Sequence, residues 1–239
     1  MHVDTICYCL EPMDDWNAFL EKLAFDLRDQ ITKHGLPADA PRMVGLLFAR
    51  PQSTLSKAEI LPNLGYFHVR SGQFISLFCA GYSEDSGWED SEEVCDLKGK
   101  RWSFSNTGFD QIRRRLENGS KWQYAGGVQL ILTNARLNGF DTAILDLSSA
   151  ICANLDEMKS AGAITSVESF FETLCRYAED PNEVDPTWGF SDKAGVKIAG
   201  TSLKSLILSL LPKSLGADVQ KAAHFAVVDI SKPSTSSPL

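Results

Sequence analysis

Hydrophobic residues recur every three or four positions between residues 14 and 34, and this spacing predicts an amphipathic helix. Asp14 is expected to cap its start, and Gly35 followed by Pro37 to end it. A second helix is predicted from Asn106. The same spacing continues over 148–162 and 165–180, where Ser149 and Thr165 are the expected caps. Residues 202–212 and 217–225 are also expected to be helical. The C-terminal third is therefore predicted to be rich in helix.

Short apolar runs between these segments predict strands. They are residues 2–9, 43–49, 100–105, 128–133, 141–148 and 225–230. The run at 43–49 has no alternation of polar positions, which is typical of a strand buried on both faces. The stretch LGYFHVRSGQF, residues 64–74, has Ser-Gly between two aromatic-rich runs, and this pattern predicts an antiparallel hairpin that continues to residue 82.

Alternating strand and helix signals predict an α/β or α+β fold, with a mixed β-sheet that includes one antiparallel hairpin and carries helices on its faces. Residues 1–230 are interpreted as a single globular domain. The polar, proline-broken segment 231–239 is predicted to be a disordered tail.

Composition and the lengths of the apolar runs indicate the cellular environment of the protein. All apolar runs fall well short of the ~20 residues that a membrane span needs. The start of the chain lacks the basic region and the small-residue cleavage site of a secretion signal. Five of the six cysteines sit inside apolar segments without metal-ligand spacing, so they are interpreted as free thiols of a cytoplasmic protein. No cofactor or metal is required by the sequence.

Charge is unevenly distributed along the chain. The seven acidic residues within 83–97 have no base among them, and the next segment, 98–121, carries seven bases and only two acids. The basic set that could bind a ligand is Lys98, Lys100, Arg101, Arg113, Arg114 and Arg115. The net charge of −8 does not favour nucleic acid. A protein partner or a small anionic ligand is the expected binding target.

A predicted hairpin at 64–74 would place Tyr66, His68 and Arg70 on one strand face. Arg70 could bind a phosphate or carboxylate through two hydrogen bonds, and His68 could act as acid or base near neutral pH. A solvated strand face explains the same three residues without any chemistry. The row is therefore a candidate catalytic site with a structural alternative.

Two further patterns suggest nuclease chemistry. Arg28 and His34 resemble the R-x(4–6)-H motif of HEPN-type ribonucleases, a family of all-helical bundles. The acid-x-Lys triplets Asp96–Lys98 and Glu157–Lys159 match part of a metal-dependent nuclease site, which also needs acids on adjacent strands.

Two classes of function remain. The first is a cytoplasmic interaction or ligand-sensing protein, which uses the acidic segment 83–97 and the basic segment 98–121 as a binding surface. The alternative is an enzyme acting on a phosphate-containing substrate, a nuclease or nucleotide hydrolase, through Tyr66, His68 and Arg70. The sequence leaves open whether the chain is an enzyme.

Overall fold

The computed structural model describes residues 16–35, 37, 41–70, 75–84, 89–97, 100–139, 141–178, 216, 219, 222 and 225–231. Their helices are α1 Trp16–His34, η1 Ser56–Ile60, η2 Leu61–Asn63, α2 Leu64–Arg70, α3 Asn106–Gly119, α4 Leu155–Ser160 and α5 Val167–Ala178. The strands are β1 Arg42–Phe48, β2 Ile75–Cys79, β3 Tyr82–Glu84, β4 Glu92–Leu97, β5 Lys100–Phe104, β6 Gln129–Asn138, β7 Thr142–Asn154 and β8 Val227–Asp229. None of the described helices combines the length and the hydropathy of a membrane span.

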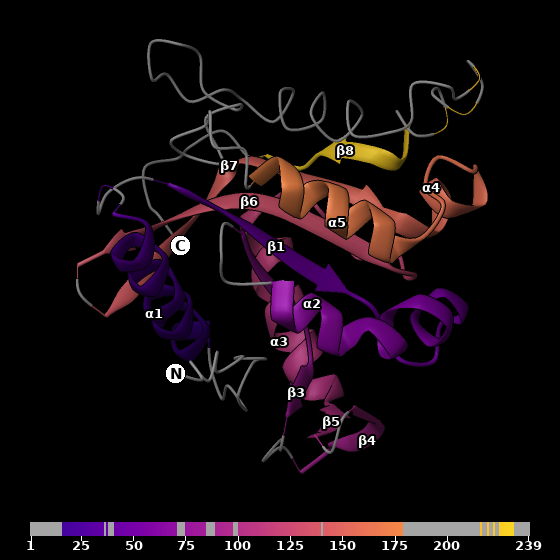
Figure 1. The fold of residues 1–239 in the computed structure, drawn as a ribbon, viewed down its shortest axis with the longest axis horizontal. Helices are drawn as coiled ribbons and strands as arrows, with labels where there is room; N and C mark the ends of the chain where they lie inside the picture. Colours follow the sequence, from indigo (N-terminus) through magenta and orange to yellow (C-terminus); the bar gives the residue numbers. More distant parts are fainter. Residues whose placement is uncertain are drawn as a thin grey trace.

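The central element is a five-stranded mixed sheet with the order β2-β1-β6-β7-β8. β1 and β2 are parallel, whereas β1–β6, β6–β7 and β7–β8 are antiparallel. Every residue of β1 is buried, as the absence of alternation in its sequence predicts. Figure 1 shows this sheet crossing the middle of the molecule. The predicted α/β or α+β class with a mixed sheet is confirmed.

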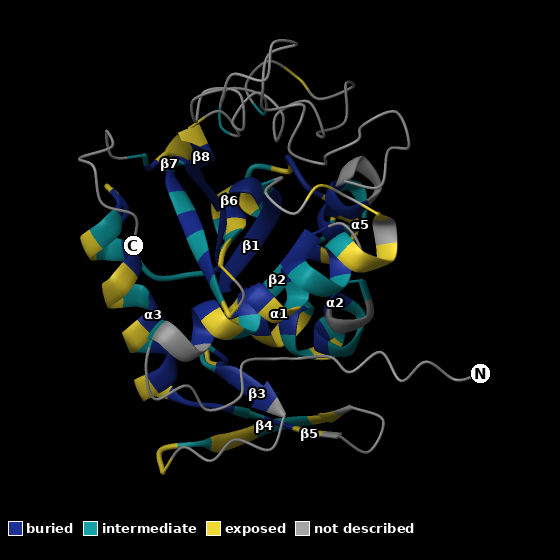
Figure 2. Cartoon of the chain, turned by 90° about the vertical axis from the view of Figure 1, so that its left-hand side faces the viewer, coloured by how far each residue is buried: buried dark blue, intermediate teal, exposed yellow. Residues whose placement is uncertain are grey.

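Helices cover both faces of this sheet. α1 packs against it through Phe19, whose ring meets that of Phe78 at 5.3 Å between centroids. α3 covers the same face beside Phe48, whose ring lies 5.5 Å from that of Phe109. Figure 2 shows α3 and α5 on opposite sides of the sheet.

A second sheet of three strands, in the order β3-β5-β4, lies at the lower end of the molecule in Figures 1 and 2. Its inner face carries Tyr82, Trp102 and Phe104, which are all buried. The acidic segment 83–97 therefore contributes to two strands of this sheet, β3 and β4. Of the chain between them, residues 85–88 lie outside the described residues.

The predicted hairpin at 64–82 is wrong. Residues 64–70 form helix α2, which continues η1 and η2 without a break, and the next strand, β2, begins only at Ile75. Helical spacing buries Leu64 and Phe67 together, at 1% and 3% exposure. Burying two such side chains stabilises the fold by about 1.5–3 kcal/mol each, more than the ~1 kcal/mol span of strand propensities. Antiparallel hairpins do occur, at β4–β5 and β6–β7.

The predicted helix at 148–162 is wrong in its first half. β7 runs to Asn154, so Ser149 is a buried strand residue, and the helix begins only at Leu155. The side chain of Asn154 caps α4 by accepting from the Glu157 amide. The helix predicted at 165–180 is confirmed, but its start is capped by Ser166, whose hydroxyl accepts from the Ser169 amide, and not by Thr165.

Other predicted elements are confirmed. These are the helices starting near residues 16 and 106, the strands at 100–104 and 129–133, and the C-terminal strand β8, which pairs with β7. The predictions for residues 2–9 and 202–212 and for the cap Asp14 lie outside the described residues, as do most of the helix predicted at 217–225 and all but Ser231 of the tail predicted at 231–239.

Candidate functional site

Tyr66 and Arg70 lie four residues apart on α2, so they share one side of the helix. Both reach Glu172 on α5. The Tyr66 hydroxyl donates to Glu172 Oε2, and Arg70 Nε donates to the same oxygen at 3.1 Å. The ring of Phe67 contacts that of Phe171 beside them, with 4.8 Å between centroids. Together these contacts fasten α2 to α5.

This arrangement differs from the predicted catalytic row. Helical spacing places position 68 away from the side that positions 66 and 70 share, because residues two apart on a helix do not face each other. The side chain of His68 lies outside the described part of the structure. The prediction that Tyr66, His68 and Arg70 share one strand face is therefore wrong.

Glu172 also determines the electrostatics of the pair. Burial, together with the hydrogen bond to Glu172 and its negative charge, raises the pKa of Tyr66 to about 12. The phenol therefore stays protonated and serves as a hydrogen-bond donor near neutral pH. Because the Arg70 guanidinium already binds a carboxylate, the arrangement is that of an interhelical ion pair. The enzyme alternative stays a prediction.

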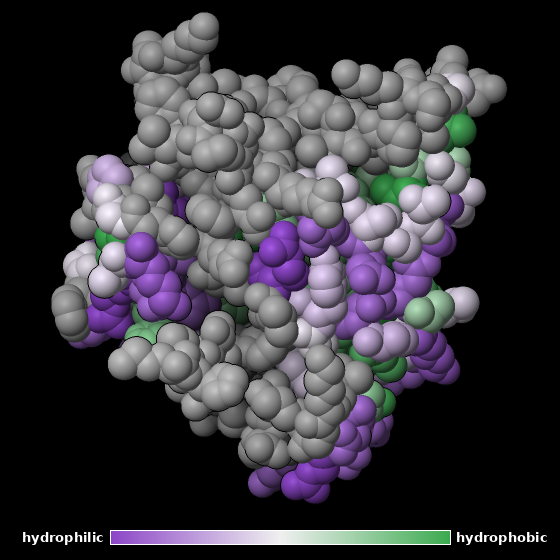
Figure 3. All heavy atoms as spheres, viewed as in Figure 1, coloured by the Kyte–Doolittle hydropathy of each residue, from purple (hydrophilic) through white to green (hydrophobic). Residues whose placement is uncertain are grey.

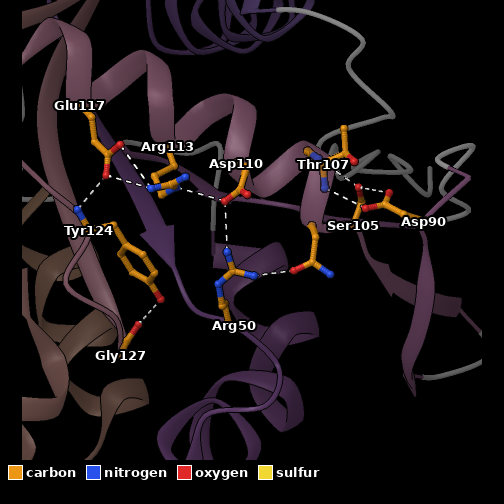
Figure 4. A network of polar contacts seen from close by, with 11 residues as sticks. Arg50, Asp90, Ser105, Thr107, Asp110, Arg113, Glu117, Tyr124 and Gly127 are labelled. Carbon is orange, nitrogen blue, oxygen red and sulfur yellow. Dashed lines mark hydrogen bonds and ion pairs between the residues drawn. The ribbon is translucent and has the colours of Figure 1, made fainter.

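Arg113, one of the predicted binding residues, is engaged within its own helix. Its guanidinium binds Asp110 at 3.1 Å and Glu117 at 3.3 Å. Glu117 also accepts from the Tyr124 amide at 3.0 Å, which joins α3 to the loop before β6 (Figure 4). The charge of Arg113 is thus balanced inside the protein.

Arg50 extends the same network and was not singled out by the sequence. It follows β1 and binds Asp110 at 3.1 Å, and it donates to Asn106 Oδ1 (Figure 4). Its guanidinium carbon lies 4.4 Å from the centre of the Phe109 ring, within the range of a cation–π contact. No local sequence pattern connects Arg50 with Asp110, because the two are sixty positions apart.

The other predicted basic residues that the structure describes lie on two different elements. Arg114 and Arg115 are exposed on α3, and Arg115 lies 5.9 Å from the Trp16 ring of α1. Arg101 is exposed on β5 in the other sheet. Lys98 and the side chain of Lys100 lie outside the described residues. The basic segment is thus divided between α3 and the β4–β5 hairpin.

Several acids of the acidic segment lie together on and just before β4. β4 is an outer strand of the small sheet, and Glu92, Glu93 and Asp96 are exposed along it, with Glu89 just before it. Purple, hydrophilic spheres gather at this lower end of the molecule in Figure 3. Asp96 lies directly opposite Arg101 in the β4–β5 pairing. Within the described ranges no ion pair involves Glu89, Glu92 or Glu93.

Asp90 attaches this acidic segment to the body of the protein. Its carboxylate accepts from the Ser105 hydroxyl at 2.6 Å and from the Thr107 amide at 2.8 Å, at the start of α3 (Figure 4). The hydrogen bond from Ser105 contributes most to lowering the pKa of Asp90 below its ordinary value. An ionised Asp90 therefore holds the chain ahead of β4 against α3, a role that its place in an acidic run concealed.

The nuclease patterns are not supported by the contacts that the structure describes. Arg28 forms an ion pair with Asp141, and the helix that carries it leads into a sheet rather than a helical bundle. Lys159 binds Glu59 at 2.7 Å. Among the described residues, no group of three or more His, Cys, Asp or Glu side chains could hold a metal ion.

Comparison of the chain with protein-family models, with curated proteins and with solved structures gives no match.

Proposed function

We propose that the protein is an interaction protein that binds a basic partner protein through an acidic surface on β4. This surface, called here the β4 surface, consists of Glu89, Glu92, Glu93 and Asp96. The observation that supports the proposal is the contrast between the charged segments. Glu92 and Glu93 are exposed on an outer strand and form no ion pair within the described residues, whereas the central arginine of the basic segment, Arg113, is balanced by two acids.

Charge complementarity identifies the class of partner. Exposed carboxylates attract a basic surface and repel an acidic one, and this sets which partners approach and how fast. The net charge of −8 adds a longer-range attraction for cationic proteins. The location of the charges on a strand that is tied to α3 by Asp90 presents them in a fixed geometry.

The test measures binding of a fluorescein-labelled peptide of alternating lysine and valine by fluorescence anisotropy. The test variant carries Glu92→Gln, Glu93→Gln and Asp96→Asn. The control variant carries Glu21→Gln, Glu157→Gln and Glu168→Gln, three exposed acids on helices, so that both variants change the net charge equally. At ~0.5 kcal/mol for each surface charge, the test variant should bind about tenfold more weakly than the control.

Salt should have a matching effect. Raising NaCl from about 0.1 M to about 1 M shortens the screening length from about 10 Å to about 3 Å, which should remove most of the difference between the two variants. Equal weakening in the test and control variants would show that only net charge matters. That outcome would overturn the β4 surface as a binding site.

A further inference from the structure

β4 offers main-chain groups as well as charges. It pairs with β5 along one side and is the last strand of its sheet, so within the described residues no strand pairs with its other side. Alternate N–H and C=O groups of an outer strand point away from the sheet and can pair with a further strand. The β4 surface therefore borders a row of hydrogen-bonding groups.

Side-chain positions along β4 differ between the two faces. Cys95 is opposite Trp102, on the inner face of the small sheet, and its Sγ lies near the carbonyl of Leu61 in η2. Glu93 is opposite Ser103, and Asp96 is opposite Arg101. The pairing shifts between Glu93 and Cys95, which leaves Val94 as an extra residue and marks a bulge. Glu93 and Asp96 thus lie on the outer face of β4, whereas Glu92, opposite Phe104, lies on the same face as Cys95 but at an exposed position.

Charge selects among the strands that could pair here. A second copy of this chain would bring Glu92, Glu93 and Asp96 against the same acids, and like charges on directly opposed strands are destabilising. An extended segment with alternating lysine or arginine would instead place cations beside these carboxylates. The acids thus disfavour self-association, a common hazard of outer strands, without closing the edge to a basic strand.

The strand is also held in place before any partner arrives. Asp90 joins the chain just ahead of β4 to the start of α3, and Arg50 joins α3 to the end of β1 through Asn106 and Asp110. A fixed edge need not lose conformational freedom on pairing, which lowers the cost of binding.

From this geometry we infer that the partner's basic segment binds as an additional β-strand along β4. The inference rests on the proposed function and adds the mode of binding to it. Main-chain hydrogen bonds would supply affinity, and the acids of β4 would supply selection for basic residues, as in other cases where an extended peptide extends a sheet.

The test compares how tightly two peptides bind to the 239-residue chain. The first is the labelled lysine–valine peptide, and the second has the same sequence with every backbone amide nitrogen methylated. Methylation removes the peptide's main-chain donors and leaves its charge unchanged. Since each main-chain hydrogen bond is worth about fivefold in binding, loss of two or more should weaken the methylated peptide by more than about tenfold. Hydrogen exchange of the Glu92–Leu97 amides is measured with each peptide.

Slower exchange of β4 amides with the first peptide, together with weak binding of the methylated one, supports strand addition. Equal binding of both peptides, still sensitive to Glu92→Gln, Glu93→Gln and Asp96→Asn, overturns strand addition and leaves the proposed function standing. Insensitivity of both peptides to these substitutions overturns both proposals. Protection of β4 by a second copy of the chain, seen without peptide and accompanied by a dimer mass, also overturns the inference.

Discussion

Replacing Gly127 by alanine should destabilise the protein far more than the same change at the neighbouring Gly126. Both glycines have positive φ, at +71° and +92°, a region that costs an L-residue about 1–2 kcal/mol. A methyl group on Gly127 would lie 2.5 Å from Asp156 Oδ2, whereas one on Gly126 would meet nothing within 4 Å. Comparing the two substitutions therefore separates the cost of backbone strain from the cost of the steric collision.

The magnitude of the collision follows from what Asp156 does. Its carboxylate accepts a hydrogen bond from the Val128 amide, where the loop enters β6. Displacing it would forfeit a bond to a charged group, worth about 1.5–3 kcal/mol. Gly127→Ala should thus cost roughly 2.5–5 kcal/mol by adding this loss to the φ strain, and Gly126→Ala only the strain of about 1–2 kcal/mol. The gain from restricting the unfolded chain is the same for both and cancels.

Urea unfolding followed by tryptophan fluorescence gives the two free energies of unfolding. The same two glycine substitutions are then made in an Asp156→Ala background. There the difference between them should disappear, because the colliding carboxylate is gone. Equal costs in the native background, or a difference that survives Asp156→Ala, would refute the collision as the cause.

Two further predictions concern ionisable groups. Burial raises the pKa of Asp26 from 3.8 to about 7 despite the opposing charge of Lys22, so the folded protein keeps a proton that the unfolded chain loses, and stability falls as pH rises between these values. Asp26→Asn should therefore stabilise the protein more at about pH 8 than at about pH 4, as measured by urea unfolding, and equal effects at both pH values would contradict this. Glu172→Gln should lower the pKa of Tyr66 from about 12 towards 10.0 without reaching it, since burial remains, as followed by tyrosinate absorbance. Glu168→Gln, on the exposed side of the same helix, should leave it unchanged.

The β4 surface shows how far the sequence could predict a candidate site. The run of acids at 83–97 is visible without a structure, and so is the basic segment that follows it. That the first forms an outer strand and that Arg113 in the second is balanced by Asp110 and Glu117 depends on pairing and packing. The sequence shows that a residue is charged, but it does not show whether the side chain faces solvent or a counter-ion.

Residues 64–70 show the opposite case, in which the local pattern misleads. An aromatic, β-branched run beside Ser-Gly favours a hairpin, yet this run is the last part of a longer helical segment that packs against α5. Strand propensity differs by only about 1 kcal/mol between residues, and burial of Leu64 and Phe67 outweighs it.

The sequence alone determined the elements whose apolar pattern extends over many residues or whose burial is complete, namely α1, α3 and β1. The mixed sheet was expected from a hairpin at 64–82, but its antiparallel pairs are β1–β6, β6–β7 and β7–β8. Apolar patterns are local, because each helix or strand must place its own apolar residues on one side or bury them all. Tertiary structure alone decided which distant residues meet, such as Arg50 with Asp110 and Glu172 with Tyr66 and Arg70. These contacts form only when elements many positions apart pack together, and no local period encodes them.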